Sequence, residues 1–170
     1  MEKAAQCTPA ELEWVMEQYG NRVYRLAYAQ LRSTAEAEDI YQEVFLRYYQ
    51  KRPAFESEEH RRAWLLRVTV NRARTVFRSA WFRYTVPLEK RVVFEEPEEV
   101  KLDGALGKLR PGEREVLHLY YYEELSVREI GELLKRKEST VRTQLTRARR
   151  HLAEIMKGEM YVSEEISGNE

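Results

Sequence analysis

Apolar side chains recur three and four residues apart along most of this 170-residue chain, and the alternation typical of β-strands is almost absent. Leu12, Val15 and Met16 show this spacing close to the N-terminus. Because the spacing places apolar side chains on one face of an α-helix, we predict an all-α fold. The helices are expected over residues 9–31, 34–50, 58–84, 102–109, 113–123, 127–135 and 139–156.

Short polar residues mark where several of these helices begin. Thr8 stands directly before Pro9, and Ser33 stands three residues before Glu36, which are arrangements typical of helix N-termini. Ser57 can cap the next helix in the same way. Gly20 offers a point where the first helix can break.

The distribution of prolines and charges divides the chain into two helical domains. Pro87 and Pro97 bracket a charged stretch without a clear helical pattern, which we interpret as a linker. The last dozen residues contain four acids and no base, and we expect them to be disordered. The predicted organisation is a first domain over 8–85, an acidic linker over 86–101, a second domain over 102–157 and an acidic tail over 158–170.

The net charge is zero, with 29 basic and 29 acidic residues, but the charges are segregated. Residues 61–84 contain seven arginines and no acid, and residues 135–157 contain eight bases and two acids. Residues 86–103 between them contain six acids and three bases. Two basic blocks indicate two surfaces for an anionic polymer, and the alternative is two solvated helix faces.

The composition argues against several other classes of protein. Cys7 is the only cysteine, so no internal disulfide can form, and the three histidines lie far apart at spacings that do not suit a metal site. We find no nucleophile–base pair and no glycine-rich phosphate loop, so we expect neither a cofactor nor an enzyme. No apolar run approaches the roughly 18 residues that span a bilayer, and the first residues lack the apolar core of a secretory signal, so we expect a cytoplasmic protein without membrane insertion.

A short helix, a tight turn and a long basic helix follow one another in the second domain. Ser126 can cap the short helix, and Ser139 with Thr140 can cap the long one. This order matches the helix-turn-helix, whose second helix enters the major groove of DNA. In projection one apolar stripe of the long helix faces the short helix and comprises Val141, Leu145, Ala148, Leu152 and Ile155. The opposite side comprises Ser139, Arg142, Thr143, Thr146 and Arg150, with Arg147 and Arg149 beside it. Arginines and small hydroxyl residues suit base edges and phosphates, and the alternative is a solvated polar face.

The second domain resembles region 4 of bacterial sigma factors. The resemblance lies in LGKLRPGEREVLHLYYYEELS over residues 106–126, in EIGELL over 129–134 and in the segment 139–152. It implies contacts to the −35 duplex from Lys137, Ser139, Thr140, Arg142, Thr143, Thr146, Arg147 and Arg150. The turn departs from the family pattern, since Lys135 and Arg136 stand where a glycine and an apolar residue are usual. We expect the basic turn of Lys135, Arg136 and Lys137 to lie beside phosphate.

A second row of basic residues lies on the helix predicted over 58–84. One stripe of this helix is apolar and comprises Ala63, Leu66, Val70, Ala73, Phe77, Ala80 and Trp81. About 100° away lie Trp64, Arg67, Asn71, Arg74 and Arg78 at spacings of three or four. Guanidinium groups beside an aromatic and an amide suit a single strand, whose backbone is charged and whose bases are unstacked. For Trp64 a place in the core is an equal alternative.

The first domain resembles sigma region 2, and the chain as a whole is similar to the extracytoplasmic-function sigma factors. AEDIYQEVFLR over 37–47 resembles the helix that docks on the RNA polymerase clamp, and AWLLRVTVN over 63–71 resembles the stretch that follows it. The resemblance implies polymerase contacts from Asp39, Gln42, Glu43 and Phe45, and a grip of the arginine row on the separated −10 strand. It also implies that the loop 51–60 helps to form a pocket for a flipped base. Without this resemblance, the acidic helix expected over residues 34–50 is interpreted as an ordinary amphipathic helix.

The function expected from this resemblance is that of a two-domain sigma factor. Its partners are the RNA polymerase core, through clamp and flap, promoter DNA and an anti-sigma factor, and Tyr120, Tyr121 and Tyr122 are expected to divide between core packing and a flap contact. One alternative is a helix-turn-helix repressor or activator with an N-terminal dimerisation domain, which binds duplex as the free protein. Another is a polymerase adaptor that does not bind DNA, whose activity survives replacement of Arg142 and Arg150.

Overall fold

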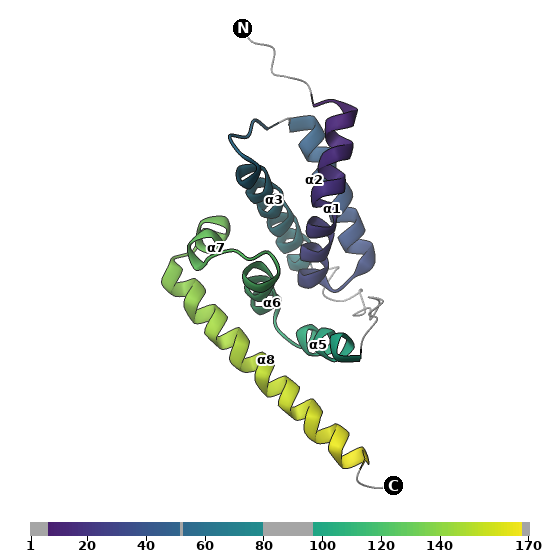
Figure 1. The fold of residues 1–170 in the computed structure, drawn as a ribbon, viewed down its shortest axis with the longest axis vertical. Coiled ribbons are helices and arrows are strands. Elements are labelled where there is room, and N and C mark those ends of the chain that lie inside the picture. The colour runs from purple at the N-terminus through teal and green to yellow at the C-terminus, as the bar shows by residue number, and fades with distance from the viewer. Residues whose placement is uncertain (1–6, 52, 80–96, 168–170) are drawn as a thin grey trace. The chain divides into compact units, whose positions relative to one another are not determined.

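The computed structural model describes residues 7–51, 53–79 and 97–167, and its chain divides into two compact units, Met1–Lys90 and Arg91–Glu170. The first unit contains α1 (Pro9–Leu31), α2 (Thr34–Lys51) and α3 (Glu58–Arg78). Each of these helices packs against the other two, as Figure 1 shows. The second unit contains α5 (Pro97–Gly107), α6 (Pro111–Leu117), the π-helical turn η1 (His118–Tyr122), α7 (Val127–Leu134) and α8 (Glu138–Ser167). Each described element is helical, as predicted.

The predicted N-caps of the first unit form. The hydroxyl groups of Thr8, Ser33 and Ser57 accept hydrogen bonds from backbone amides three residues further on, at 3.1, 3.3 and 3.1 Å. Each bond satisfies an amide that a helix leaves without an intrahelical partner. The sequence signals therefore locate the three starts to within a residue.

Helix α1 does not break at Gly20. The Tyr41 ring of α2 packs on this glycine, and a Cβ at position 20 would lie 3.1 Å from it. The glycine is therefore explained by the close approach of two helices, and α1 runs unbroken to Leu31. Arg32 ends it in the left-handed conformation, with φ 54°.

Helix α3 is buried over a broader face than one stripe predicts. Leu66, Val70 and Ala73 are buried as expected, and Leu65, Val68 and Thr69 are buried as well. The reason is that α3 contacts both α1 and α2, so two flanks of the helix are covered. Ala63 and Phe77 are half-buried, whereas Ala80 and Trp81 lie outside the described residues.

Two boundaries of the second unit differ from the prediction. Helix α5 begins at Pro97, inside the predicted linker, because proline followed by two glutamates favours a first helical turn. Helix α8 begins at Glu138 and continues to Ser167, through most of the segment predicted to be disordered. Gly158 is the only helix breaker between 158 and 167, which leaves the helix without a strong stop. The rest of the predicted linker, over 86–96, lies outside the described residues.

The segment predicted as one helix over 113–123 changes character at His118. Helix α6 passes there into η1, where the amide of Glu123 donates to the carbonyl of His118 at 3.1 Å. Such a turn inserts one extra residue and rotates the side chains that follow. Leu119 is fully buried, whereas Tyr121 and Tyr122 are among the most exposed large apolar residues that the structure describes.

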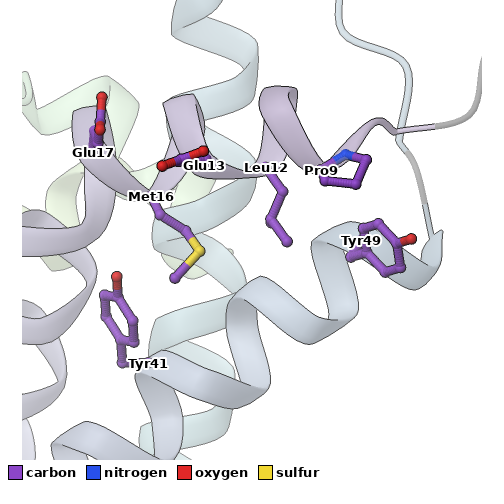
Figure 2. A pocket seen from close by; sticks show the side chains of 7 residues that line it. All are labelled: Pro9, Leu12, Glu13, Met16, Glu17, Tyr41 and Tyr49. Atoms are coloured by element: carbon purple, nitrogen blue, oxygen red, sulfur yellow. The ribbon is translucent and has the colours of Figure 1, made fainter.

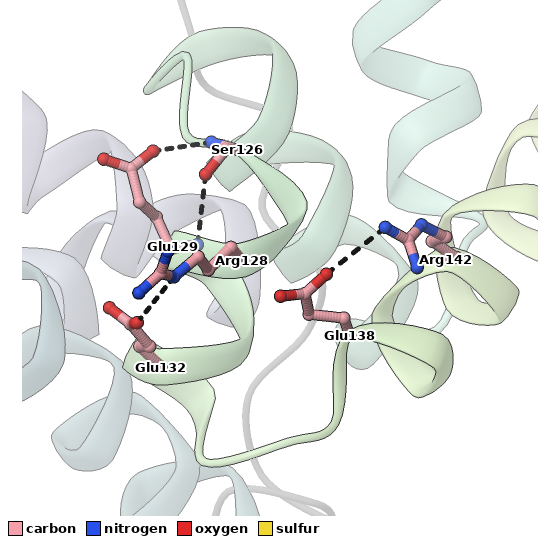
Figure 3. A network of polar contacts seen from close by, with 6 residues as sticks. All are labelled: Ser126, Arg128, Glu129, Glu132, Glu138 and Arg142. Atoms are coloured by element: carbon pink, nitrogen blue, oxygen red, sulfur yellow. Dashed lines mark hydrogen bonds and ion pairs between the residues drawn. The ribbon is translucent and has the colours of Figure 1, made fainter.

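Helices α7 and α8 form the predicted helix-turn-helix. Ser126 and Glu129 make reciprocal capping bonds at the start of α7 (Figure 3). Both helices contribute buried residues, and α8 packs on α5 and α6 as well as on α7; the buried residues are Ile130, Leu133, Leu134, Val141, Leu145 and Ala148. Ser139 and Thr140 lie in the first turn of α8 and do not cap it, since the helix begins one residue earlier.

Candidate nucleic-acid and polymerase interfaces

The polar face of α8 is exposed along its first three turns. All the residues predicted to contact the −35 duplex are exposed, namely Lys137, Ser139, Thr140, Arg142, Thr143, Thr146, Arg147 and Arg150. Val141, Leu145 and Ala148 on the opposite side are buried. The structure thus brings the predicted set together on one surface, because a single apolar stripe anchors the helix.

Local hydrogen bonds determine which donors and acceptors on this face are available to a ligand. The hydroxyls of Thr143 and Thr146 donate to the carbonyls of Ser139 and Arg142, at 3.0 and 2.9 Å. Their oxygens therefore face outward chiefly as acceptors. Arg142 pairs with Glu138 one turn away at 3.2 Å, and its side chain is 64 % exposed (Figure 3). Because an exposed pair of this kind is weak, Arg142 can exchange Glu138 for a DNA acceptor at little cost.

Arg149, beside this face, is held by η1. Its Nε donates to the hydroxyl of Tyr121 at 2.6 Å, and its guanidinium lies 5.1 Å and 5.4 Å from the ring centres of Tyr120 and Tyr121. Cation–π contacts of this kind restrain both partners. The tyrosines therefore connect η1 to α8, a role that sequence reasoning missed because the partners are 28 residues apart.

The row of residues on α3 is presented less uniformly than the face of α8. Arg67, Asn71 and Arg78 are exposed, and Arg74 is half-buried. Trp64 packs edge-on against the rings of Tyr48 and Phe55, with centroid distances of 5.9 and 6.1 Å, and belongs to the margin of the core. The geometry favours the core alternative for Trp64, whose side chain is partly buried.

A cluster of side chains connects the loop between α2 and α3 to α1, and no sequence pattern predicts it. The guanidinium of Arg61 lies 5.4 Å from the ring centres of both Trp14 and Phe55. It also pairs with Glu58 at 3.0 Å, and Glu58 accepts a hydrogen bond from Tyr19 at 2.6 Å. Burial, followed by this bond, raises the pKa of Tyr19 to about 12. Contacts between residues some 40 positions apart leave no local signal in a sequence.

The acidic face of α2 exposes Asp39, Gln42 and Glu43. Glu43 accepts a bond from Nε of Arg72 on α3 at 2.5 Å. Burial, then the nearby carboxylates of Asp39 and Glu43, raises the pKa of Glu36. The face therefore concentrates negative charge along one side of α2.

Phe45, which the resemblance assigns to the polymerase contact, is not part of this exposed face. Its side chain is 3 % exposed and packs against Tyr41, with ring centres 4.8 Å apart. The neighbouring Leu46 is 55 % exposed, because one step along a helix turns a side chain by about 100°. Leu46 is the exposed apolar residue that the sequence prediction missed. It borders a shallow depression between α2 and α3 that is also lined by Glu43, Arg47, Gln50, Val68 and Arg72.

A second open groove lies between the first half of α1 and α2. Figure 2 shows Leu12 and Met16 of α1 directed toward α2, with Tyr41 and Tyr49 on the α2 side. Glu13 and Glu17 lie at its rim. In the part of the chain that the structure describes, no group of three His, Cys, Asp or Glu residues is placed to hold a metal ion. None of the described helices is both long and apolar enough to cross a membrane.

Comparisons with protein-family models match both units. Residues 15–83 match sigma-70 region 2, and residues 99–152 match sigma-70 region 4. The first matched segment contains α3, and the second contains α7 and the first half of α8.

Two curated relatives cover most of the chain. The ECF RNA polymerase sigma factor SigW of Bacillus subtilis is 30 % identical over 160 residues, which are 81 % of this chain and 84 % of SigW. The ECF RNA polymerase sigma factor BldN of Streptomyces coelicolor is 29 % identical over 153 residues, which are 82 % of this chain. The match spans only 58 % of BldN.

Solved structures share the fold. CnrH, in complex with the cytosolic domain of CnrY, has a TM-score of 0.68 at 23 % identity and covers 91 % of this chain and 93 % of that one. The sigma factor RpoE of Bartonella quintana, in complex with the anti-sigma factor NepR, has a TM-score of 0.67 at 20 % identity, over 86 % and 97 % of the two chains.

Proposed function

The chain belongs to the extracytoplasmic-function group of the sigma-70 family, and we propose that it binds the core of RNA polymerase and directs it to promoters. In this proposal α8 reads the −35 duplex and α3 holds the separated −10 strand. The protein carries out no reaction of its own and acts in the cytoplasm, where polymerase and promoters meet.

The observation that carries the proposal is the unbroken polar face of α8. A major groove admits one helix, and a helix can enter it only if its contacting side is free of packing. Arg142, Thr143 and Thr146 occupy such a side near the start of α8, opposite the buried Val141 and Leu145. Arginine can bridge two acceptors of guanine, and the threonine oxygens can accept from base amino groups.

Exposed arginines on α3 support the second DNA contact. Arg67 and Arg78 can follow a phosphate backbone, and Asn71 between them can bond to a base edge. The cluster of Trp14, Phe55 and Arg61 holds the preceding loop on α1, which suits a loop that receives an extruded base.

The polymerase contact is assigned to Asp39, Gln42, Glu43 and Leu46. Interfaces typically combine an apolar centre with a charged rim, and Leu46 supplies the apolar side chain that Phe45 does not. The partner surface is expected to be basic around an apolar depression. The solved relatives were captured with CnrY and with the anti-sigma factor NepR, and we propose that an anti-sigma factor also controls this chain.

Run-off transcription tests the proposal. Core polymerase with this chain should yield a transcript from a promoter template that core alone does not transcribe. The variant Asp39→Arg with Glu43→Arg should lose both the transcript and co-purification with core, while its helix content stays unchanged. Glu13→Arg with Glu17→Arg, on α1, is the matched control and should retain both. Unchanged co-purification of the α2 variant would contradict the assignment.

A repressor and an adaptor remain distinct outcomes of the same assay. A repressor would bind duplex as the free protein and would not restore transcription by core polymerase. An adaptor would bind core polymerase, and its activity would survive Arg142→Ala with Arg150→Ala.

A further inference from the structure

The turn between α7 and α8 carries three consecutive bases, and their side chains have different environments. Lys135 and Lys137 are exposed, whereas the Arg136 side chain is only 25 % exposed. We propose that Arg136 is a positioning residue for −35 recognition, which fixes α8 on α6 and makes no phosphate contact. The inference rests on the proposed function of α8.

The guanidinium of Arg136 joins two helices to the turn. One amino group, Nη1, donates to Oε1 of Gln144 on α8 at 2.9 Å. The other, Nη2, lies 3.6 Å from Oε1 of Glu115 on α6, whose side chain is 3 % exposed. Both amino groups are therefore directed into the protein, away from a DNA backbone running past the exposed lysines.

The backbone of the turn leaves Arg136 little freedom. Lys135 ends α7 in the left-handed conformation, with φ 55°, and the amide of Arg136 donates to the carbonyl of Gly131 at 2.8 Å. A Cβ at position 131 would lie 2.8 Å from the carbonyl oxygen of Arg136, so only glycine fits there. The backbone of the turn therefore fixes the position of the Arg136 Cα, and Gln144 and Glu115 hold its guanidinium.

Because Glu115 is buried, we expect the loss of its contact with Arg136 to disturb the turn. A buried carboxylate that loses a cationic partner is destabilised, and the entry of water or a movement of the turn can relieve this. Gln144, the second partner, directly follows Thr143 on the proposed reading face. A movement of the turn would therefore displace Arg142 and Thr143 relative to the base edges, and specificity would fall.

Salt-dependent binding separates a positioning role from a phosphate contact. The full chain with core polymerase is measured against matched and scrambled −35 duplexes over a range of KCl concentrations. Arg136→Met should lower the ratio of the two affinities by at least about fivefold, the loss expected for one misplaced base contact, and leave the salt slope unchanged. Lys137→Met, the matched control, should lower the salt slope by about one and leave the ratio unchanged. A slope lowered by Arg136→Met with an unchanged ratio would overturn the inference.

A double variant covers the case in which Arg136→Met alone folds poorly. Glu115→Leu with Arg136→Met replaces the buried ion pair by apolar side chains, an exchange that is often neutral or stabilising. It should restore both the melting temperature and the affinity ratio. A ratio as low as that of the single variant would contradict the inference.

Arg142→Ala identifies which proposal has failed. If it leaves the affinity ratio unchanged, the assignment of α8 as the reading helix is wrong. If it lowers the ratio and Arg136→Met does not, only the positioning role of Arg136 is wrong.

Discussion

Helices α3 and α8 both present arginines at helical spacing, but they are packed in different ways. Helix α3 contacts α1 and α2 and buries adjacent positions, including Leu65, Leu66, Thr69 and Val70. Helix α8 contacts α5, α6 and α7, but over residues 138–158 it fully buries only Val141, Leu145 and Ala148. A helix held through one stripe leaves a wide free side, as entry into a groove requires, whereas a helix held on two flanks leaves a narrow row.

This difference in packing determines the shape of each proposed DNA-binding surface. The polar face of α8 is exposed as a whole and can meet a duplex across several base pairs. On α3 the exposed arginines are interrupted by half-buried Arg74 and end beside Trp64 at the edge of the core. A narrow row suits one flexible strand, which can follow it, better than a rigid duplex.

The largest expected effect tests the two-sided packing of α3. Leu65 lies beside the predicted stripe and is 1 % exposed, so Leu65→Ala should destabilise the first unit by about 2–5 kcal/mol. Thr146, on the side of α8 opposite the buried stripe, is exposed, so Thr146→Ala should change stability by less than about 0.5 kcal/mol. If both variants changed stability by similarly small amounts, the proposed difference in packing between α3 and α8 would be wrong.

The stability of each unit can be measured separately. All three tryptophans, at 14, 64 and 81, fall within Met1–Lys90, so urea unfolding followed by tryptophan fluorescence reports the first unit. Hydrogen exchange at the buried amides of α7 and α8 reports the second.

A smaller effect compares two helix ends. Arg32 and Lys135 both end a helix in the left-handed conformation, but Arg32 is 6 % exposed with its guanidinium 5.0 Å from the Tyr28 ring centre, and Lys135 is exposed. Lys135→Gly should stabilise the second unit by about 0.5–1 kcal/mol, because it relieves the conformational strain. Arg32→Gly should destabilise the first unit, because packing is lost as well. A loss of hydrogen-exchange protection in Lys135→Gly would contradict this account.

The smallest effect at neutral pH concerns Tyr19. Its pKa is raised to about 12 in the folded chain, above the value near 10 of an exposed tyrosine. Its contribution to stability is therefore complete below pH 10 and is lost as the pH rises through 12. The free energy of unfolding of the first unit should fall over this range, and Tyr19→Phe should make the fall shallower. An identical pH dependence in both proteins would exclude Tyr19 as its source.

The sequence predicts this molecule best where structure depends on neighbouring residues. The caps at Thr8, Ser57 and Ser126 and the stripe of Val141, Leu145 and Ala148 follow from spacing alone. Their partners lie within a few residues, so periodicity and capping rules apply directly.

Features that depend on residues far apart in the chain could not be predicted from the sequence. The burial of Phe45 and the exposure of Leu46 depend on how α2 rotates against α1 and α3, and the pattern does not specify that rotation. The contact of Arg136 with Glu115, 21 residues earlier, also has no local signal in the sequence. The unbroken α1 at Gly20 likewise depends on the ring of Tyr41.

The central claim is that the two units contact different forms of DNA, and a crossed binding measurement tests it most directly. Complexes of core polymerase with the full chain are titrated with a −35 duplex and with a single-stranded −10 oligonucleotide. Arg142→Ala should lose about 1–3 kcal/mol on the duplex and nothing on the single strand. Arg67→Ala with Arg78→Ala, which spares half-buried Arg74, should weaken the single strand and leave the duplex unchanged. If both variants weaken both ligands equally, the division of labour between α3 and α8 is wrong.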